Sequence, residues 1–286
     1  ATRERLALEA FEHTAAYDAT IAGFLHSKFV RAQGSAPSAS FPKELTLTLT
    51  QQQALRYGEN PHQKAAVYRF DLQKGLHQFK QIQGKELSYN NLLDANAAWS
   101  IAREWTEAAA VVIKHTNPCG AAVAPRLLDA YTRAFQGDEK SAFGGIVALS
   151  QTCDRDTAAK IVETFMELVL APDYTEEALA VFGAKKNLRV LANPDFHFIP
   201  QTWEFRSIDG GLLAQDSDRL EIAADQLKFV TQRAPSEQEI RELLFAWRLI
   251  RHVKSNAIVI AKDRMLVGVG CGHTSRIEAV DSAIRK

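Results

Sequence analysis

Short, continuously apolar runs alternate with longer segments of helical periodicity between residues 91 and 191, and few architectures accommodate that alternation. Residues 108–113 and 145–149 are apolar almost throughout, as expected of strands that are buried on both faces. Residues 91–105 and 126–135 instead repeat their apolar side chains with the spacing of one helix face. Because helices and strands that alternate in this way pack as layers, we expect an α/β fold.

Further elements extend this pattern toward both ends of the chain. Strands are expected at residues 44–50, 64–70, 76–83, 168–171, 188–191, 257–261 and 265–269. Helices are expected at residues 154–165, 175–185 and 236–252, and from Ser275 onward. The helix at 236–252 has a clear start, because Ser236 and Glu239 can form a capping box.

The organisation of the chain follows from these elements and from one linker. Residues 3–29 carry apolar side chains at helical spacing and predict one amphipathic helix or two short ones. Residues 33–43 are rich in Gly, Ser and Pro, which is typical of a linker. We therefore expect three parts: residues 1–43, a layered subdomain over 44–204, and a second subdomain over 205–286 whose pattern is incomplete.

Charge and composition exclude several classes of protein. Lys plus Arg and Asp plus Glu both number 34, so no basic excess favours binding to nucleic acid or to an anionic membrane. No apolar run approaches the roughly 20 residues that cross a bilayer. The cysteines, Cys119, Cys153 and Cys271, are odd in number and far apart, which argues against a disulfide framework and a paired metal site. We expect a cytoplasmic protein.

The densest chemical cluster is KHTNPCG, which starts at Lys114 where a buried strand is expected to end. Ligand crevices of open α/β sheets lie beyond the carboxyl ends of strands, so this is a favoured place for catalytic groups. His115 and Lys114 can act as a general acid and base pair. By themselves the two residues also fit a solvated strand end and a hydrogen-bonded loop.

Three other segments combine chemical groups with turn residues. RYGENPHQ, from Arg56, holds a cation that can bind a phosphate, although an exposed turn explains the segment equally well. GVGCGHTSR, from Gly268, leads into a helix whose first amides and Arg276 can meet an anion, or is simply a tight turn. SAFGG, from Ser141, can bring Phe143 and backbone to a flat ligand or serve as a packing turn. Asn90, Asn91 and Asp94 are expected to open a helix, with no catalytic role.

Taken together, long stretches of the sequence resemble one family, the aminoimidazole-carboxamide ribotide formyltransferase part of the bienzyme that also carries inosine monophosphate cyclohydrolase. The matching stretches are RYGENPHQ from Arg56, GKELSYNNLLDANAAW from Gly84, VIKHTNPCGAAV from Val112, SAFGGIVALS from Ser141, GGLLAQD from Gly210 and VKSNAIVIAKDRMLVGVG from Val253. They are ordered and spread over nearly the whole chain.

The resemblance implies a fold, substrates and site residues. The fold would be cytidine-deaminase-like, duplicated, with the second copy incomplete here, and the active site would lie at a homodimer interface. The substrates would be aminoimidazole-carboxamide ribotide and 10-formyltetrahydrofolate, without zinc. The resemblance assigns catalysis to the first two of the following residues and substrate binding to the rest: Lys114, His115, Arg56, Tyr57, Phe143, Gly144, Glu167, Asn256 and Arg276.

Departures from the family and two competing hypotheses complete the expectations. The family more often carries glutamine at His273, and it continues beyond both ends of this sequence. Residues 1–29 resemble only the last helices of the cyclohydrolase, so cyclohydrolase activity is expected to be absent. Because the family continues after Lys286 with a segment that helps to bind folate and ribotide, formyl transfer by a chain that ends there is expected to be severely impaired. A zinc deaminase needs H-x-E and P-C-x-x-C, whereas Thr116 and Asn117 follow His115, and Ala122 replaces the second cysteine. The other alternative is a catalytically silent fragment that binds the ribotide or forms a dimer.

Overall fold

The computed structural model describes residues 1–32, 41–70, 74–198 and 203–285. The chain divides into two compact units. The first consists of residues 1–52, 68–73 and 201–217, and the second of residues 53–67, 74–200 and 218–286. All predicted site residues belong to the second unit.

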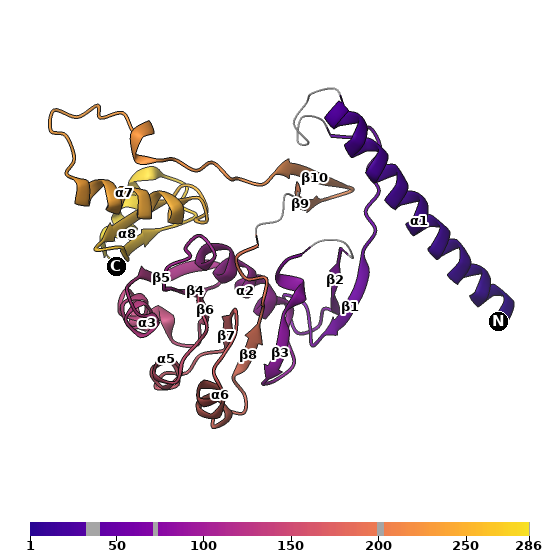
Figure 1. Cartoon of the computed structure of the whole chain (residues 1–286), viewed down its shortest axis with the longest axis horizontal. Coiled ribbons are helices and arrows are strands. Elements are labelled where there is room, and N and C mark those ends of the chain that lie inside the picture. Colours follow the sequence, from indigo (N-terminus) through magenta and orange to yellow (C-terminus); the bar gives the residue numbers. More distant parts are fainter. Residues whose placement is uncertain (33–40, 71–73, 199–202, 286) are drawn as a thin grey trace. The chain divides into compact units, whose positions relative to one another are not determined.

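An eight-stranded mixed sheet is the centre of the second unit, with the strand order β11-β12-β5-β4-β6-β7-β8-β3 (Figure 1). The strands β6, β7 and β8 run parallel to one another, and the other pairings in the sheet are antiparallel. In chain order the strands are β3 (Lys80–Gln83), β4 (Ala109–Lys114), β5 (Asn117–Val123), β6 (Ile146–Leu149), β7 (Leu168–Ala171), β8 (Arg189–Ala192), β11 (Ile258–Lys262) and β12 (Met265–Gly270). The α/β prediction is confirmed.

Two apolar clusters, one on each face of the sheet, form the core. Alternate residues of β4 enter different clusters, with Ala110 and Val112 in one and Val111 and Ile113 in the other. The first cluster is covered by α3 (Leu127–Gln136), α5 (Arg155–Ile161) and α6 (Glu176–Gly183), and the second by α2 (Tyr89–Ala102) and α7 (Glu237–Ile250). Burial on both faces explains why β4 and β6 are apolar at nearly every position.

Two glycines of the GVGCG segment, residues 268–272, allow a helix to pack closely against a strand. A Cβ atom at Gly268 would lie 2.1 Å from the carbonyl oxygen of Ala283, and one at Gly270 would lie 2.0 Å from that of Ala279. Both carbonyls belong to α8 (Arg276–Arg285), which therefore rests directly on β12. These two glycines therefore allow close contact between a helix and a strand.

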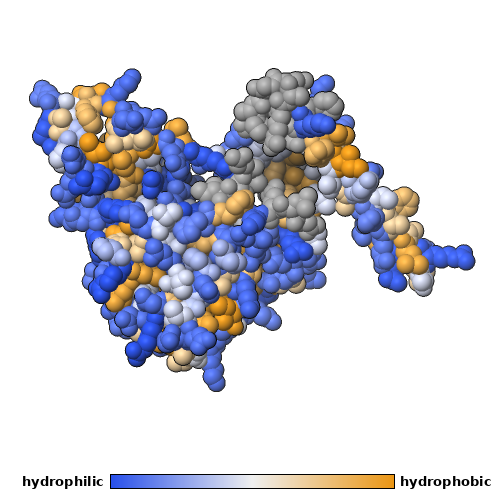
Figure 2. Space-filling view, viewed as in Figure 1, coloured by the Kyte–Doolittle hydropathy of each residue, from blue (hydrophilic) through white to orange (hydrophobic). Residues whose placement is uncertain are grey.

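The first unit contains α1 (Thr2–Ala32), a single helix where one or two were expected, and the hairpin of β9 (Trp203–Ile208) and β10 (Gly211–Asp216). Large apolar side chains of α1 are exposed, among them Leu6, Phe11 and Phe24. Figure 2 shows hydrophobic patches, in orange, along this helix. No described helix is both long enough and apolar enough to cross a membrane.

Two strand expectations need correction. The alternation at residues 44–50 does not form a strand there, because β1 (Thr50–Leu55) starts only at its last residue and pairs with β2 (Ala65–Arg69). The expected strand at 76–83 is reduced to β3, which follows a 3-10 helix at Leu76–Gln78 and pairs with β8. The linker expected at 33–43 lies mostly outside the described residues.

β5 was not expected as a strand, since Pro118 and Gly120 argue against an inner position. Its pairing with β4 shifts register: Val112 lies opposite Gly120, and Ile113 lies opposite Pro118. Cys119 is therefore an extra residue, a bulge that allows a proline within this strand. The strands β11 and β12 join the same sheet through β5, so strands from both sides of residue 205 share one sheet.

Candidate active site

The Lys114–His115 pair lies on a tight hairpin turn between β4 and β5. Lys114 pairs with Asn117, which leaves His115 and Thr116 as the two loop residues. Both have positive φ angles, 50° and 63°. Hairpin turns of this kind favour Asn and Gly, and a β-branched residue such as Thr is a true outlier at positive φ. Such residues cost about 1–3 kcal/mol each and persist only where the surroundings hold them.

The Lys114 ammonium group is held by the segment that precedes β6. Its Nζ atom donates to the carbonyl oxygens of Phe143 at 2.9 Å and Gly144 at 3.1 Å. Gly144 has a φ of +68°, and a Cβ atom there would lie 3.1 Å from the same Nζ. A glycine is thus needed both for the backbone conformation and for the close approach of the ammonium group.

The sheet register brings further predicted residues to the same edge. Ile113 lies opposite Ile146, Ile146 opposite Leu168, and Leu168 opposite Arg189. The turn at the end of β4 therefore lies at the amino ends of the parallel strands β6, β7 and β8. The turn lies at the carboxyl end of β4, as predicted, but at the amino ends of the parallel strands, because β4 runs antiparallel to β6.

Glu167 lies on this edge, directly before β7, and is paired. Its carboxylate accepts a hydrogen bond from Nη1 of Arg189 at 2.7 Å. The Arg189 guanidinium is buried, with 5% of its side chain exposed, and also donates to the carbonyl oxygen of Glu86 from Nε at 3.0 Å and from Nη2 at 2.9 Å. Arg189 was missed by the sequence reasoning, although a cation that begins a buried apolar strand is a signal.

Asp94, to which no catalytic role was given, contacts the turn directly. Its Oδ1 atom accepts a hydrogen bond from the backbone amide of Thr116 at 2.7 Å. Burial raises the pKa of the Asp94 carboxyl above its ordinary value, while backbone hydrogen bonds from Thr116 and His115 and the charges of His115 and Lys114 act to lower it.

A cavity of about 630 Å³ opens beside Lys114 and His115. Of the predicted site residues it is lined by Lys114, His115 and Phe143, and its remaining lining residues are Asp138, Lys140, Ser141 and Arg285. The other predicted residues do not line it: Arg56, Tyr57, Gly144, Glu167, Asn256 and Arg276. Lys140 and Arg285 were not singled out in the sequence, because isolated surface cations carry no distinctive pattern.

Arg56 and Tyr57 lie beside the start of α2. The amide of Arg56 donates to the carbonyl oxygen of Leu87 at 3.0 Å, and that of Tyr89 donates to Tyr57 at 3.1 Å. The Arg56 guanidinium lies 5.2 Å from the centre of the Tyr57 ring, a cation–π distance. The backbone of this loop is thus fixed by the helix that also carries Asp94.

Asn256 and Arg276 lie together at the loop before α8. The Asn256 side chain donates to the carbonyl oxygens of His273 at 3.1 Å and Thr274 at 3.4 Å. Because Arg276 is the first residue of α8 and is exposed, its side chain lies where the positive end of the helix dipole meets solvent. This grouping agrees with an anion site, and the assignment stays a prediction.

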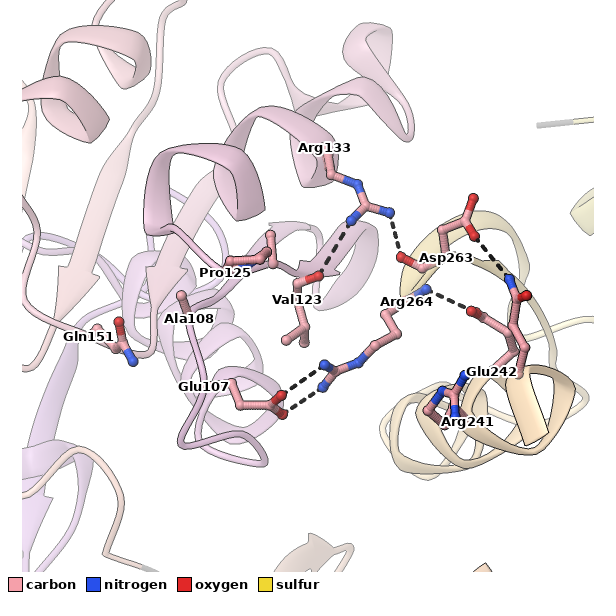
Figure 3. Close-up of a pocket in the computed structure, with 12 residues that line it drawn as sticks. Glu107, Ala108, Val123, Pro125, Arg133, Gln151, Arg241, Glu242, Asp263 and Arg264 are labelled. Carbon is pink, nitrogen blue, oxygen red and sulfur yellow. Dashed lines mark hydrogen bonds and ion pairs between the residues drawn. The ribbon is translucent and has the colours of Figure 1, made fainter.

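A second cavity, of about 560 Å³, lies elsewhere in the same unit and is lined by charges that bind one another (Figure 3). Arg264 forms a bidentate pair with Glu107, at 2.8 and 2.6 Å. Arg133 donates to the backbone carbonyls of Val123 and Asp263. These bonds fix the β11–β12 turn to the sheet, so the network has a structural explanation. Among the residues that the structure describes, no cluster of three or more His, Cys, Asp or Glu side chains can hold a metal ion.

Comparison with known proteins points to one family. The sequence model of the AICARFT/IMPCHase bienzyme family matches residues 1–286. The chain is similar to the bifunctional purine biosynthesis protein PurH of Thermoanaerobacter sp. (strain X514), with 44% identity over 286 residues, 100% of this chain and 54% of that protein. For the PurH proteins of Bacillus cereus (strain B4264) and Bacillus mycoides (strain KBAB4), identity is 45% over 285 residues, 99% of this chain and 54% of each relative. The chain spans about half the length of the curated relatives it matches.

Proposed function

The chain belongs to the AICARFT/IMPCHase bienzyme family, and on that premise we propose that it carries the formyltransferase site of purine biosynthesis. The reaction transfers a formyl group from 10-formyltetrahydrofolate to the 5-amino group of aminoimidazole-carboxamide ribotide. The observation that carries this proposal is the exposed His115 imidazole on a fixed turn, adjacent to an ammonium group at the edge of a cavity.

The chemistry needs a base and a cation. The 5-amino group is a weak nucleophile, because its lone pair is delocalised into the imidazole ring and carboxamide. As its nitrogen bonds to the formyl carbon, His115 accepts the amine proton, and the Lys114 ammonium group stabilises the developing oxyanion. The bond between the formyl carbon and the folate nitrogen then breaks, and that nitrogen takes up a proton from the Lys114 ammonium group or from the protonated His115. The products are the formamido ribotide and tetrahydrofolate.

Substrate binding is assigned to groups in the cavity lining and to groups outside it. We assign the ribotide to Arg56, Tyr57, Asn256 and Arg276, with Glu167 as an acidic contact. Phe143 and Gly144 border the ligand. Since the phosphate of the ribotide and the glutamate carboxylates of the folate are anionic, Lys140 and Arg285 also suit this cavity. A cytidine-deaminase-like duplicated fold, homodimerisation and a cytoplasmic location belong to the same proposal.

The first experiment measures ribotide binding and formyl transfer on one preparation of this chain. We expect ribotide to bind, and tetrahydrofolate to be released only when both substrates are present. His115→Gln should lower kcat by about 100- to 10,000-fold, and Lys114→Met by about 100- to 1,000-fold. Ribotide binding without any turnover would favour the silent-fragment alternative, and the absence of both would contradict the proposal.

Metal analysis separates the transferase from a zinc deaminase. The proposed reaction needs no zinc, so the purified chain should contain far less than one zinc per molecule and should keep its activity after treatment with a chelator. Stoichiometric zinc whose removal abolishes activity would favour the deaminase.

A further inference from the structure

The β4–β5 turn needs an anchor from outside its own sequence. His115 and Thr116 are consecutive residues at positive φ, and neither is glycine. The Thr116 hydroxyl and the Asn117 side chain donate to the carbonyl oxygen of His115, at 2.7 and 2.9 Å. These bonds satisfy that carbonyl group but leave the backbone amides of the turn to another acceptor.

Asp94 supplies that acceptor. Its Oδ1 atom accepts a hydrogen bond from the Thr116 nitrogen at 2.7 Å, and the neighbouring backbone of His115 also acts to lower the pKa of this carboxyl group. Two successive amides in a turn form a concavity suited to an anion. The carboxyl group therefore binds the turn as an anionic ligand does.

The helix that carries Asp94 also contacts the loop of Arg56 and Tyr57, which the proposed function assigns to ribotide binding. One helical turn earlier, the Asn90 side chain donates to the carbonyl oxygen of Glu59 at 3.1 Å, and the amide of Tyr89 donates to Tyr57. The helix body is rigidly packed, with Ala95, Ala98 and Trp99 buried in the core. The catalytic turn and the Arg56–Tyr57 loop thus share one rigid support.

We propose that Asp94 is a positioning residue of this site, whose carboxyl group holds the His115–Thr116 turn in its left-handed conformation and thereby fixes the imidazole of His115 at the cavity. The proposal rests on the proposed function for its catalytic consequence, whereas its structural content can be measured without activity. Asp94 touches the turn backbone and acts on the reaction only through His115.

The test compares Asp94→Ala with a matched control, Asp154→Ala. Asp154 forms the same kind of bond, accepting from the Thr157 amide at 2.8 Å, at the start of α5 beyond the opposite end of β6. Asp94→Ala should accelerate hydrogen exchange of the Thr116 amide about 10- to 100-fold. It should also move the ring signal of His115 in the NMR spectrum, which is assigned by its loss in His115→Gln. Asp154→Ala should leave both unchanged.

Kinetics then measure the catalytic consequence in the same proteins. Asp94→Ala should lower kcat by about 100-fold with little change in the KM for ribotide, as expected for a misplaced reacting group. Asp94→Asn keeps an acceptor oxygen and should retain most of kcat. Thr116→Gly tolerates positive φ, so the double variant Asp94→Ala/Thr116→Gly should recover much of the lost kcat.

The outcomes separate the two proposals. Unchanged Thr116 exchange and an unmoved His115 signal in Asp94→Ala overturn the positioning role, whatever the activity. A lowered kcat that neither Asp94→Asn nor the double variant restores also overturns it. If the unmodified chain transfers no formyl group, the proposed function fails, and exchange and ring signal alone decide whether Asp94 fixes the turn.

Discussion

Individual side chains at the edge of the sheet are placed by close backbone contacts. Lys114 is the clearest case, since its ammonium group donates to two carbonyl oxygens and lies against the backbone of Gly144. Neither contact can be predicted from the periodicity or composition of the sequence. A residue with a simple sequence signal can therefore depend on a neighbour whose importance appears only in three dimensions.

Gly144→Ala tests this dependence. The methyl group would lie 3.1 Å from Nζ of Lys114, at a φ of +68°, so we expect a loss of about 1–2 kcal/mol in stability together with a marked decrease in kcat. Gly210→Ala is the control, because Gly210 has the same φ and no atom within 4 Å of the added Cβ. Urea unfolding and formyl-transfer kinetics should show similar destabilisation in both but lost catalysis in Gly144→Ala only. Equal kcat in the two variants contradicts the prediction.

Arg276→Ala tests the anion site at the start of α8. Loss of a charge-assisted hydrogen bond to phosphate should weaken ribotide binding about 10- to 100-fold, as measured by titration calorimetry. The control Arg241→Ala removes an exposed arginine on α7 and should leave ribotide affinity unchanged. Unchanged affinity in Arg276→Ala would count strongly against Arg276 as a phosphate ligand.

At the scale of elements, a buried ionic cluster ties α7 to the segment that follows α2. The Glu104 carboxylate is paired with Arg251 and accepts from Nε2 of His252 at 3.0 Å, and the side chains of Glu104 and Arg251 are only 10% and 11% exposed. Burial acts to raise the pKa of Glu104, but the hydrogen bond and charge of His252 and the charge of Arg251 outweigh it, so the pKa lies below its ordinary value.

This lowered pKa predicts a specific pH dependence. A depressed carboxyl pKa stabilises the fold above the ordinary value of about 4.3, and the contribution is lost as the pH falls through the lowered value. Glu104→Gln should lower the free energy of unfolding by about 3–5 kcal/mol at pH 7. It should also reduce the loss of stability at acid pH, as measured by urea unfolding at a series of pH values. Glu163→Gln, in an exposed pair with Lys160, should change stability by less than about 1 kcal/mol. If Glu104→Gln loses as much stability at acid pH as the unmodified protein does, this assignment is contradicted.

Sequence patterns predicted the elements better than their pairing. Residues 168–171 were predicted as a strand with the bounds that the structure gives β7, because a buried parallel strand is apolar throughout. β5 was missed because a proline is tolerated there only through the bulge at Cys119. The Lys114–His115 pair was predicted from local chemistry, whereas the contacts of Asp94 and Arg189 were not predicted, since each joins residues 22 positions apart.

At the scale of the whole molecule, the predicted site lies entirely within one of the two compact units. The long helix α1 belongs to the other unit, and its large apolar side chains are exposed rather than part of the described core. The chemistry proposed for the site therefore makes no use of α1.

Removal of residues 1–32 tests that independence. Because no predicted ribotide contact lies in this segment, ribotide affinity should stay unchanged, while the helical signal in circular dichroism decreases. Titration calorimetry on the shortened and unmodified chains provides the comparison, and Arg276→Ala in the shortened chain should reproduce its effect in the unmodified chain. A large loss of ribotide affinity on removal of α1 would show that the site extends beyond its own unit.

The two-residue turn between β4 and β5 has a consequence for how this family can diverge. An inserted or deleted residue between Lys114 and Asn117 would change the loop length on which the register of the hairpin depends, and a shift of one residue moves every side chain of a strand to the opposite face. Functional descendants of this sequence should therefore keep that interval at constant length, and length variation should accumulate in exposed segments such as residues 217–235.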